Sequence, residues 1–511
     1  MAQETELKLC LRPPDVSRLL AHPLLAAQAP HRQQLLNTYF DTADLTLMRH
    51  RIAVRERRVG RRTLLTVKTA GTSVGGLSRR GEWEGPTRPG RPDFAALVDD
   101  EALARLLTEI RPRLLPLFRT DFLRRRWQLT HAGANIELAL DEGHIATGGP
   151  TGQTPRQETL LELELELLNG PAQALWSLAR ALTLGNGPEE GLWLFPSDRS
   201  KAERGLALYR DQPCLPQRAR PSALGPSMHP VTAFRTAAQD ALAQWLANVQ
   251  GFLANTVGGA LADPEFVHQA RVALRRLRTS LRLFRRHLPP AFVDHWSGFW
   301  QQTASALGEA RDWDVLDERL IDWLGTRARR GQPPEDQATL AEAVLARRLA
   351  AHRLTLDHLG APALAQAQLA FAEALLALPA PPDEPSGHGL ADWATATLEK
   401  RLHGLLREAR HARQLDVDGL HALRIRCKKL RYAQQCLQPL LPTHLEARLT
   451  VLVRTQERLG DLNDLSMALQ RLQENELPGA TAWAGVLRRQ QARILRTLPQ
   501  LQRDLRRLAG R

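Results

Sequence analysis

The hydrophobic pattern of this 511-residue chain changes its period once, between residues 210 and 232. Before that point, short runs such as residues 134–143 (ANIELALDEG) and 158–170 (ETLLELELELLNG) alternate polar and apolar side chains, which is typical of strands. After it, apolar residues recur three and four apart in segments rich in Leu, Ala, Arg and Gln, which is typical of helices. The sequence therefore predicts an α+β multidomain protein, with an antiparallel β domain followed by an all-α domain.

Two proline-rich segments divide the chain. Residues 211–230 contain five prolines, and residues 377–389 (ALPAPPDEPSGHG) contain four. Both are typical of linkers. We therefore expect a β domain at residues 1–210, a linker at 211–230 and a helical domain at 231–511, whose two bundles cover about 232–373 and 391–510.

The charge of the chain indicates an anionic partner. The net charge is +14, and the basic residues are overwhelmingly arginine, whose planar fork suits phosphate oxygens. Residues 1–210 hold 29 basic and 25 acidic side chains, so the later residues hold 40 and 30 and carry most of the excess. A polyanion is therefore a plausible partner, above all for the helical part.

Little in the sequence indicates secretion or a membrane. The four cysteines, at positions 10, 214, 427 and 436, lack the spacing of a metal site or a disulfide framework. No apolar run approaches the length of a membrane span, and the acidic start MAQETELKLC does not resemble a signal peptide. We expect a cytoplasmic protein with no membrane partner.

Carboxylates gather on single faces of the expected strands. In residues 4–9 (ETELKL), Glu4, Glu6 and Lys8 point to one side of an extended chain. One further pair and one triple follow the same rule, with these carboxylates on shared faces: Glu137 with Asp141, and Glu162 with Glu164 and Glu166. On a single strand, such a charged face is most simply explained by exposure to water. Clustering of repelling carboxylates favours a site for divalent cations.

Basic residues share faces in other strands. Arg55 lies on the same face as Arg57, Arg124 on the same face as Arg126, and Lys68 sits in a β-rich run. A closed sheet would bring both signs of charge into one interior, because inward and outward side chains alternate around it. Such a lining suits a short polyphosphate together with its metal ion.

Residues 1–210 resemble the CYTH family, the triphosphate tunnel metalloenzymes, whose amino-terminal ExExK signature is present as Glu4, Glu6 and Lys8. The further matches, in family order, are TYFDT (38–42), the arginines of VRER, Lys68, EWEG (82–85), DFLRRRW, IELALDEG, ELELELL and SKAERG (200–205). The resemblance implies an eight-stranded antiparallel tunnel with peripheral helices. It also implies hydrolysis or cyclisation of triphosphates with a divalent metal, Mg²⁺ or Mn²⁺.

The same resemblance implies roles for individual residues. Glu4 and Lys8 are the expected catalytic residues, with Glu4 positioning or activating the attacking water. The expected metal ligands are Glu6, Glu164 and Glu166, with Glu162 as a further candidate. The expected phosphate-binding residues are Arg55, Arg57, Lys68, Arg124, Arg126 and Lys201. Because three arginines are consecutive at 124–126, the register there stays open, and Arg125 is a candidate to face outward.

The helical part repeats itself. HQARVALRRLR (268–278) aligns with HALRIRCKKLR (421–431) at an offset of 153, and LGEARDWDVL (307–316) aligns with LGDLNDLSMA (459–468) at an offset of 152. On a helix, the shared positions fall on one stripe in each repeat. The stripes are His268, Arg271, Arg275 and Arg278, and His421, Arg424, Lys428 and Arg431. A single basic stripe is usually a solvated face, but its duplication favours a binding function.

This repeat resembles the CHAD domain, whose LG..RD and LG..ND elements are present as residues 307–312 and 459–464. The resemblance implies two four-helix bundles and binding of long-chain polyphosphate in a basic cleft, with association with polyphosphate granules as a further expectation. We expect Asp312 and Asp464 to anchor the basic helices through ion pairs or caps. Nucleic acid is the less favoured partner, because no aromatic stacking platform interleaves the cationic stripes.

The favoured function is a metal-dependent inorganic triphosphatase that hydrolyses tripolyphosphate to pyrophosphate and phosphate, with a polyphosphate-binding helical domain. Within the same fold, a class IV-type adenylate cyclase and a thiamine or nucleoside triphosphatase stay open. A non-catalytic polyphosphate-binding protein is the alternative from a different class.

Overall fold

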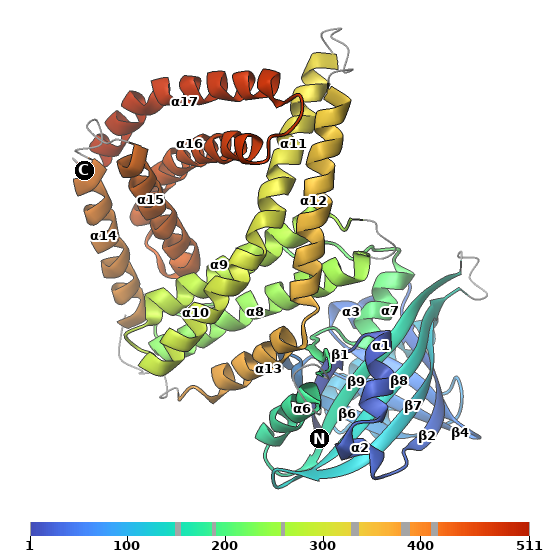
Figure 1. Cartoon of the computed structure of the whole chain (residues 1–511). Coiled ribbons are helices and arrows are strands. Elements are labelled where there is room, and N and C mark those ends of the chain that lie inside the picture. Colours follow the sequence, from blue (N-terminus) through green and yellow to red (C-terminus); the bar gives the residue numbers. More distant parts are fainter. Residues whose placement is uncertain are drawn as a thin grey trace. The chain divides into compact units, whose positions relative to one another are not determined.

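A computed structural model describes residues 2–148, 155–185, 191–256, 261–328, 337–379, 389–409 and 417–509 (Figure 1). Contacts within the chain define two units. The first contains Met1–Leu215 together with Gly360–Leu376, and the second contains Pro216–Leu359 and Ala377–Arg511. The domain limits expected from the prolines stay a prediction.

The first unit is built on an antiparallel sheet that closes on itself. Around the ring, the order is β1 (Ala2–Cys10), β9 (Arg156–Asn169), β8 (Ala134–Thr147), β7 (Leu115–His131), β2 (His31–Asp41), β3 (Ala53–Val59), β4 (Arg62–Lys68) and β6 (Leu77–Thr87). Closure comes from β1, which pairs with β9 on one edge and with β6 on the other. The expected eight-stranded antiparallel tunnel is therefore confirmed.

Alternation along each strand separates a charged interior from an apolar exterior. On β1, Leu7 and Leu9 are fully buried on the outer face, where α6 (Gln173–Leu184) packs against β1, β7 and β9. A second outer cluster joins Val67 and Trp83 to side chains of α4 (Phe94–Leu97) and α5 (Glu101–Ile110). The tunnel wall is thus held from outside by helices, which leaves its interior free for polar side chains.

Several short elements complete this unit. They are α1 (Pro13–Leu20), α2 (Pro23–Ala26), α3 (Thr46–Arg49), β5 (Thr72–Val74), the 3₁₀ turn η1 (Arg111–Arg113) and β10 (Phe195–Pro196). The helix α13 (Pro362–Ala377) belongs here as well. Its Glu373 accepts a hydrogen bond of 2.7 Å from Gln173 and pairs with Arg180 at 3.3 Å, both on α6.

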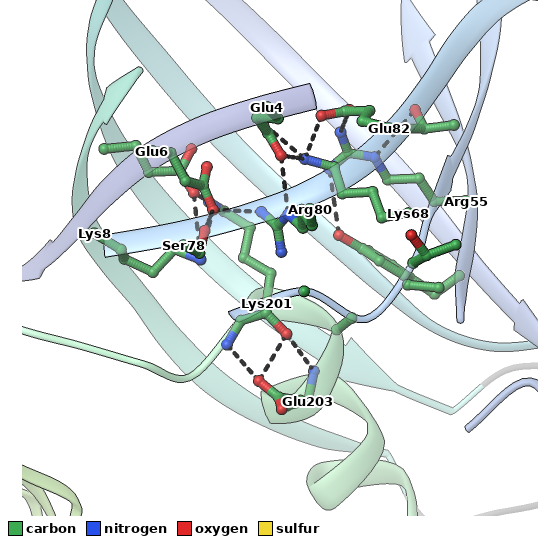
Figure 2. A pocket seen from close by; sticks show the side chains of 18 of the residues that line it. Glu4, Glu6, Lys8, Arg55, Lys68, Ser78, Arg80, Glu82, Lys201 and Glu203 are labelled. Atoms are coloured by element: carbon green, nitrogen blue, oxygen red, sulfur yellow. Dashed lines mark hydrogen bonds and ion pairs between the residues drawn. The ribbon is translucent and has the colours of Figure 1, made fainter. Parts of the chain in front are cut away.

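The helix α7 (Lys201–Tyr209) packs against β7, β8 and β9. Ser200 caps it through a capping box with Glu203, which fixes where the helix begins. Gly205 lies so close to Phe118 that a Cβ there would come within 2.0 Å of the ring. This close packing directs Lys201, at the first helical position, towards the tunnel (Figure 2).

The second unit is helical, as expected. Its first half contains α8 (Pro230–Asn255), α9 (Pro264–Phe284), α10 (Pro290–Ala306), α11 (Gly308–Ala328) and α12 (Ala338–Leu359). Its second half contains α14 (Gly389–Ala409), α15 (Val417–Leu437), η4 (Gln438–Leu440), α16 (Thr443–Glu474) and α17 (Ala480–Ala509). The repeated motifs fall on α9 and α15, which pack against each other, and on α11 and α16, which also meet.

Length and apolar character decide which helices could span a membrane. Within the described ranges, no helix taken alone has the required length and apolar character. The pair α12 and α13, which bends by 55° at its break, passes on length and composition when the two helices are combined.

Candidate active site

The closed sheet surrounds a cavity of about 780 Å³ (Figure 2). Of the described residues that line it, ten are acidic and ten are basic. All three signature residues of β1 are among them: Glu4, Glu6 and Lys8. The expected phosphate-binding residues Arg55, Arg57, Lys68, Arg124, Arg126 and Lys201 also line this one cavity.

Glu4 and Glu6 are held by cations from β4 and β6. Lys68 Nζ donates to both carboxylate oxygens of Glu4, at 2.9 and 3.0 Å, and Arg80 Nε donates to Glu4 at 2.9 Å. The same guanidinium also bonds to Glu6. Glu4 is therefore fixed by two cations in the tunnel wall.

Arg80 was not among the predicted site residues. It belongs to a run of alternating polar side chains on β6, Ser78, Arg80, Glu82 and Glu84, all of which line the cavity. Trp83, between two of them, is buried on the outer face. The same period-two rule that identified Glu4 and Glu6 would have found this face.

A row of carboxylates crosses three neighbouring strands. In the sheet register, Glu166 on β9 lies opposite Glu6 on β1 and opposite Glu137 on β8. Directly opposed residues in a sheet have side chains about 5 Å apart. The sequence placed these residues on shared strand faces, and the register now makes them adjacent.

Negative charge is poorly balanced at Glu166. None of the described ion pairs engages it, and burial together with Glu4, Glu137 and Glu82 raises its pKa to about 7. An excess of carboxylate of this kind fits a divalent cation, which prefers oxygen ligands. Glu166, with Glu6 opposite it in the sheet, is therefore the better candidate for a metal ligand in this part of the tunnel.

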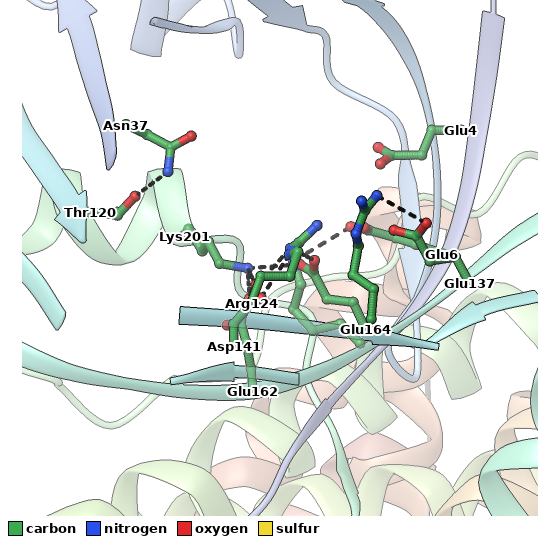
Figure 3. A network of polar contacts seen from close by, with 12 residues as sticks. Glu4, Glu6, Asn37, Thr120, Arg124, Glu137, Asp141, Glu162, Glu164 and Lys201 are labelled. Carbon is green, nitrogen blue, oxygen red and sulfur yellow. Dashed lines mark hydrogen bonds and ion pairs between the residues drawn. The ribbon is translucent and has the colours of Figure 1, made fainter. Parts of the chain in front are cut away.

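A second acidic group is already neutralised. Asp141, Glu162 and Glu164 each have an oxygen within 4.8 Å of the others, a spacing that could suit a metal (Figure 3). Lys201 Nζ lies among them, 2.8 Å from Asp141, 2.9 Å from Glu164 and bonded to Glu162. The ammonium of Lys201 thus stands where a cation would sit.

Arg124 completes this neutralised group, at 2.6 Å from Asp141 and 2.6 Å from Glu164. Glu162 is 2% exposed, bonds also to Arg204 and does not line the cavity. Of the four predicted metal ligands, Glu162 is therefore the one that this geometry favours least.

Arginines of β3 and β7, two strands separated by β2, lie close together elsewhere in the tunnel. Burial, with Arg55 and Arg124 close by, lowers the pKa of Arg57 to about 10. Arg57 Nε donates to Asn37 at 3.2 Å, and Asn37 in turn donates to Thr120 at 2.9 Å, so the guanidinium is held in place. An anion bound here would relieve the repulsion among these arginines.

The register of the three consecutive arginines is resolved. Arg124 and Arg126 line the cavity, and Arg126 donates to Glu137 at 3.3 Å. Arg125 points to the other face of β7 and pairs with Glu142. This is the arrangement expected from alternation.

In the helical unit, the predicted basic stripes of α9 and α15 face each other. Burial and then Arg424 lower the pKa of Lys428 to about 8, with Arg275 and Arg271 acting in the same direction across from α9. Arg271 is fixed by a 2.7 Å hydrogen bond to the carbonyl of Ala304. Arg271, Arg275, Arg424 and Lys428 therefore form one cluster, called here the basic cluster.

The other stripe residues lie around this cluster or outside it. Arg431 is close enough to Arg275 to lower the pKa of that guanidinium, together with burial. Arg278 is directed to Gln301, at 3.3 Å. Burial and Arg311 lower the pKa of His268. The side chain of His421 lies outside the described residues.

The paired aspartates take up different contacts. Asp312 on α11 accepts a bond of 3.4 Å from Arg471 on α16, whose guanidinium also covers the ring of Trp313 at 5.7 Å. Burial, with a smaller effect of Asp464, raises the pKa of Asp312, and Asp464 also stabilises the charge of Lys428. The contacts of Asp312 are those of an anchor between helices.

The sheet, the cavity and the paired helices define a two-part protein. Family models for the CYTH domain and for the CHAD domain match residues 2–189 and 236–473. The chain therefore combines a CYTH domain with a CHAD domain, as its motifs predicted.

Individual proteins resemble each part. An inorganic triphosphatase of Haemophilus influenzae is 30% identical over 213 residues, which is 41% of this chain and 55% of that protein. The match thus spans about half the length of this relative.

Two solved structures are also similar. The CHAD domain from the plant Ricinus communis is 26% identical, covering 57% of this chain and 96% of that chain with a TM-score of 0.42. A putative adenylyl cyclase from Hippeastrum, described as having a dominant triphosphatase activity, is 22% identical, covering 41% of this chain and 95% of that chain with a TM-score of 0.29.

Proposed function

We propose that the tunnel hydrolyses inorganic tripolyphosphate to pyrophosphate and phosphate with the help of Mg²⁺ or Mn²⁺. The observation that carries this proposal is that one cavity holds both a group of carboxylates and a group of arginines. Carboxylates crowd around Glu166, and arginines crowd around Arg57. A metal and a chain of phosphates are the pair of ligands that balances both.

The arginines bind and orient the substrate. Arg55, Arg57 and Arg124 neutralise phosphate oxygens and align the chain along the tunnel. A divalent cation held at Glu166 and Glu6 would neutralise phosphate charge and polarise a phosphoryl group.

Glu4 orients the attacking water. Its carboxylate is fixed by Lys68 and Arg80, so its position does not depend on the substrate. The water oxygen forms a bond to the terminal phosphorus while the bond from that phosphorus to the bridging oxygen breaks. The water proton passes to the Glu4 carboxylate, and pyrophosphate leaves. Lys8 and Lys201 stabilise the charge that develops on the leaving oxygen. Both lysines stay positively charged and can therefore interact with this oxygen. Burial lowers their pKa values, but Glu6 raises the pKa of Lys8 and Asp141 raises the pKa of Lys201, so both values are raised overall.

The test is release of phosphate by the purified full-length chain. Tripolyphosphate, ATP, thiamine triphosphate and longer polyphosphate are compared with Mg²⁺, with Mn²⁺ and with a chelator. We expect the highest kcat/KM for tripolyphosphate and no turnover with chelator. Formation of cyclic AMP from ATP, without phosphate release from tripolyphosphate, would instead establish a cyclase.

For the helical unit, we propose binding of long-chain polyphosphate at the basic cluster. Four cations from two helices meet there, and Nε of Arg424 is buried without a hydrogen-bond partner in the described part of the chain. Phosphate oxygens would satisfy that donor and balance the charges. Because the attraction is largely electrostatic, affinity falls steeply with salt.

Polyphosphate titration of the full-length chain at several salt concentrations tests this second proposal. Arg275→Gln removes one cation of the basic cluster, and Arg489→Gln removes an exposed arginine of α17 as the matched control. We expect a loss of roughly tenfold for the first and little change for the second. Equal losses would indicate diffuse charge attraction and no cleft. Duplex DNA serves as competitor, and a preference for DNA would refute polyphosphate as the partner.

A further inference from the structure

The lysines of this chain are few and unevenly placed. Of its 69 basic residues, six are lysines. Three of them, Lys8, Lys68 and Lys201, form ion pairs with carboxylates in the tunnel. Lys400 and Lys429 are exposed, and Lys428 is the half-buried lysine of the basic cluster. Lys428 therefore differs from every other lysine of the chain in its surroundings.

The surroundings of Lys428 favour a neutral amine. Arg424 lies one turn earlier on α15, and Arg271 and Arg275 lie opposite on α9. Asp464 on α16 is the carboxylate that opposes them, and no described side chain forms an ion pair or hydrogen bond with Lys428. With a pKa of about 8, the amine is partly unprotonated at neutral pH, when an ordinary lysine is almost fully charged.

The same surroundings attract small anions. Arg424 as a whole residue is 9% exposed, and its Nε is buried without a partner among the described residues. A desolvated lysine beside other cations is the environment in which an amine becomes a nucleophile. A nucleophile and an anion-binding group thus stand one helical turn apart.

We propose that Lys428 is a site of covalent acylation by small acyl phosphates, which the neighbouring arginines bind through the phosphate group. The unprotonated Nζ attacks the carbonyl carbon of the acyl phosphate and forms an amide bond. The bond from that carbon to the phosphate oxygen breaks, inorganic phosphate leaves, and the amine proton passes to water. No oxidant or reductant is required.

Acylation would switch the basic cluster between two charge states. The amide carries no charge, so one of the four cations is lost. Affinity for polyphosphate then falls in acylated chains. This consequence rests on the proposed polyphosphate site, whereas the reactivity of Lys428 does not.

The experiment treats the full-length chain with acetyl phosphate at pH 7.5 and follows each lysine by peptide mass spectrometry. Lys429 and Lys400 are internal controls, because both are exposed and see the same reagent. A fall in pKa of this size raises the neutral fraction about a hundredfold, and lower intrinsic nucleophilicity offsets part of it. We expect Lys428 to react roughly ten times faster than either control. The ratio should shrink towards one at pH 10, where all exposed amines are substantially neutral.

Equal rates at pH 7.5, or slower reaction at Lys428, would overturn the proposal. Repeating the reaction with an uncharged acetyl ester separates the two causes. If the arginines bind the phosphate group, the preference for Lys428 over the control lysines should be greater with acetyl phosphate than with the ester. An equal preference with both reagents would refute the anion-binding step. Arg424→Gln should slow reaction at Lys428 and leave Lys400 unchanged.

Polyphosphate binding is measured separately on unmodified and acetylated chains. Selective acetylation without any polyphosphate binding would refute the proposed partner and keep the reactive lysine. Polyphosphate binding without selective acetylation would refute the reactive lysine and keep polyphosphate as the partner.

Discussion

Arg80 Nε donates to the carboxylate of Glu4 over 2.9 Å, and the other end of the same guanidinium bonds to Glu6. One arginine of β6 therefore links two signature residues of β1 across the seam where the sheet closes. Their carboxylates are thereby kept close together in spite of their repulsion.

Arg80→Met should release these two carboxylates. We expect kcat for tripolyphosphate to fall by at least tenfold, because Glu4 loses one of its two fixing partners. The metal concentration for half-maximal activity should fall, because the carboxylates lose a competing cation. Metal titrations of activity check both, with Arg58→Met, an exposed position on β3, as the control. An unchanged kcat would show that Arg80 does not position the carboxylate of Glu4.

Glu4→Gln should abolish turnover while sparing affinity for tripolyphosphate, since the carboxylate is assigned to water and the phosphates are assigned to arginines. We expect a loss in kcat of at least a hundredfold with a change in substrate dissociation constant below about threefold. Stopped assays and equilibrium binding without turnover provide the two values. A parallel loss of substrate binding would place Glu4 in contact with the phosphates.

Glu166 should make metal affinity depend on pH. With a pKa raised to about 7, its carboxyl is protonated below that pH and cannot serve as a metal ligand. Apparent metal affinity should rise as pH increases from 6 towards 8 and then level off. Calorimetric titration with Mn²⁺ at several pH values measures this, and Glu166→Gln should remove the step. A wild-type affinity independent of pH over this range would contradict the assignment.

Arg57→Gln should weaken binding of tripolyphosphate. The arginine is buried beside Arg55 and Arg124, with Glu84 as a counter-charge at 3.4 Å, and a bound phosphate would add a further favourable contact. Loss of one charge-assisted bond predicts a rise in KM of about tenfold. Steady-state kinetics measure it, and Arg58→Gln on the opposite face of β3 is the matched control. Similar effects of both substitutions would mean that the overall charge of the strand matters more than position.

Polyphosphate binding should weaken as pH rises through 8. Lys428 carries its charge below its lowered pKa of about 8 and loses it above, so the basic cluster has one cation fewer at pH 9 than at pH 7. Titrations at constant ionic strength should show the decline, and Lys428→Arg should flatten it. Lys429→Arg should leave the wild-type pH dependence unchanged, because that side chain is exposed.

Alternation alone predicted much of the tunnel. It placed Glu4, Glu6 and Lys8 on one face and left Arg125 as the candidate to face outward, and the cavity lining agrees. Local spacing carries this information because successive side chains of a strand point to opposite faces. Arg80 obeys the same rule. It was missed because the prediction for its strand considered only the EWEG motif (82–85).

Other features depend on which segments meet, and a single sequence does not contain that information. The opposition of Glu6, Glu166 and Glu137 requires the register between three strands. The position of Lys201 among carboxylates depends on how α7 packs against the sheet. The lowered pKa of Lys428 requires α9 to pack against α15, far away in the chain.

The pairing of β1 with both β6 and β9 has a consequence for synthesis on the ribosome. β1 is made early, but its partner β9 ends at Asn169, and Lys201 follows later still. At 5–20 residues per second, β1 waits about 10 to 30 seconds for β9. During that time, the carboxylates of Glu4 and Glu6 have no tunnel around them, and the nascent β1 has an open edge that can pair with other chains. Synthesis of β9 and α7 thus decides when the catalytic residues first meet. A nascent chain stalled before Lys201 cannot assemble the active site.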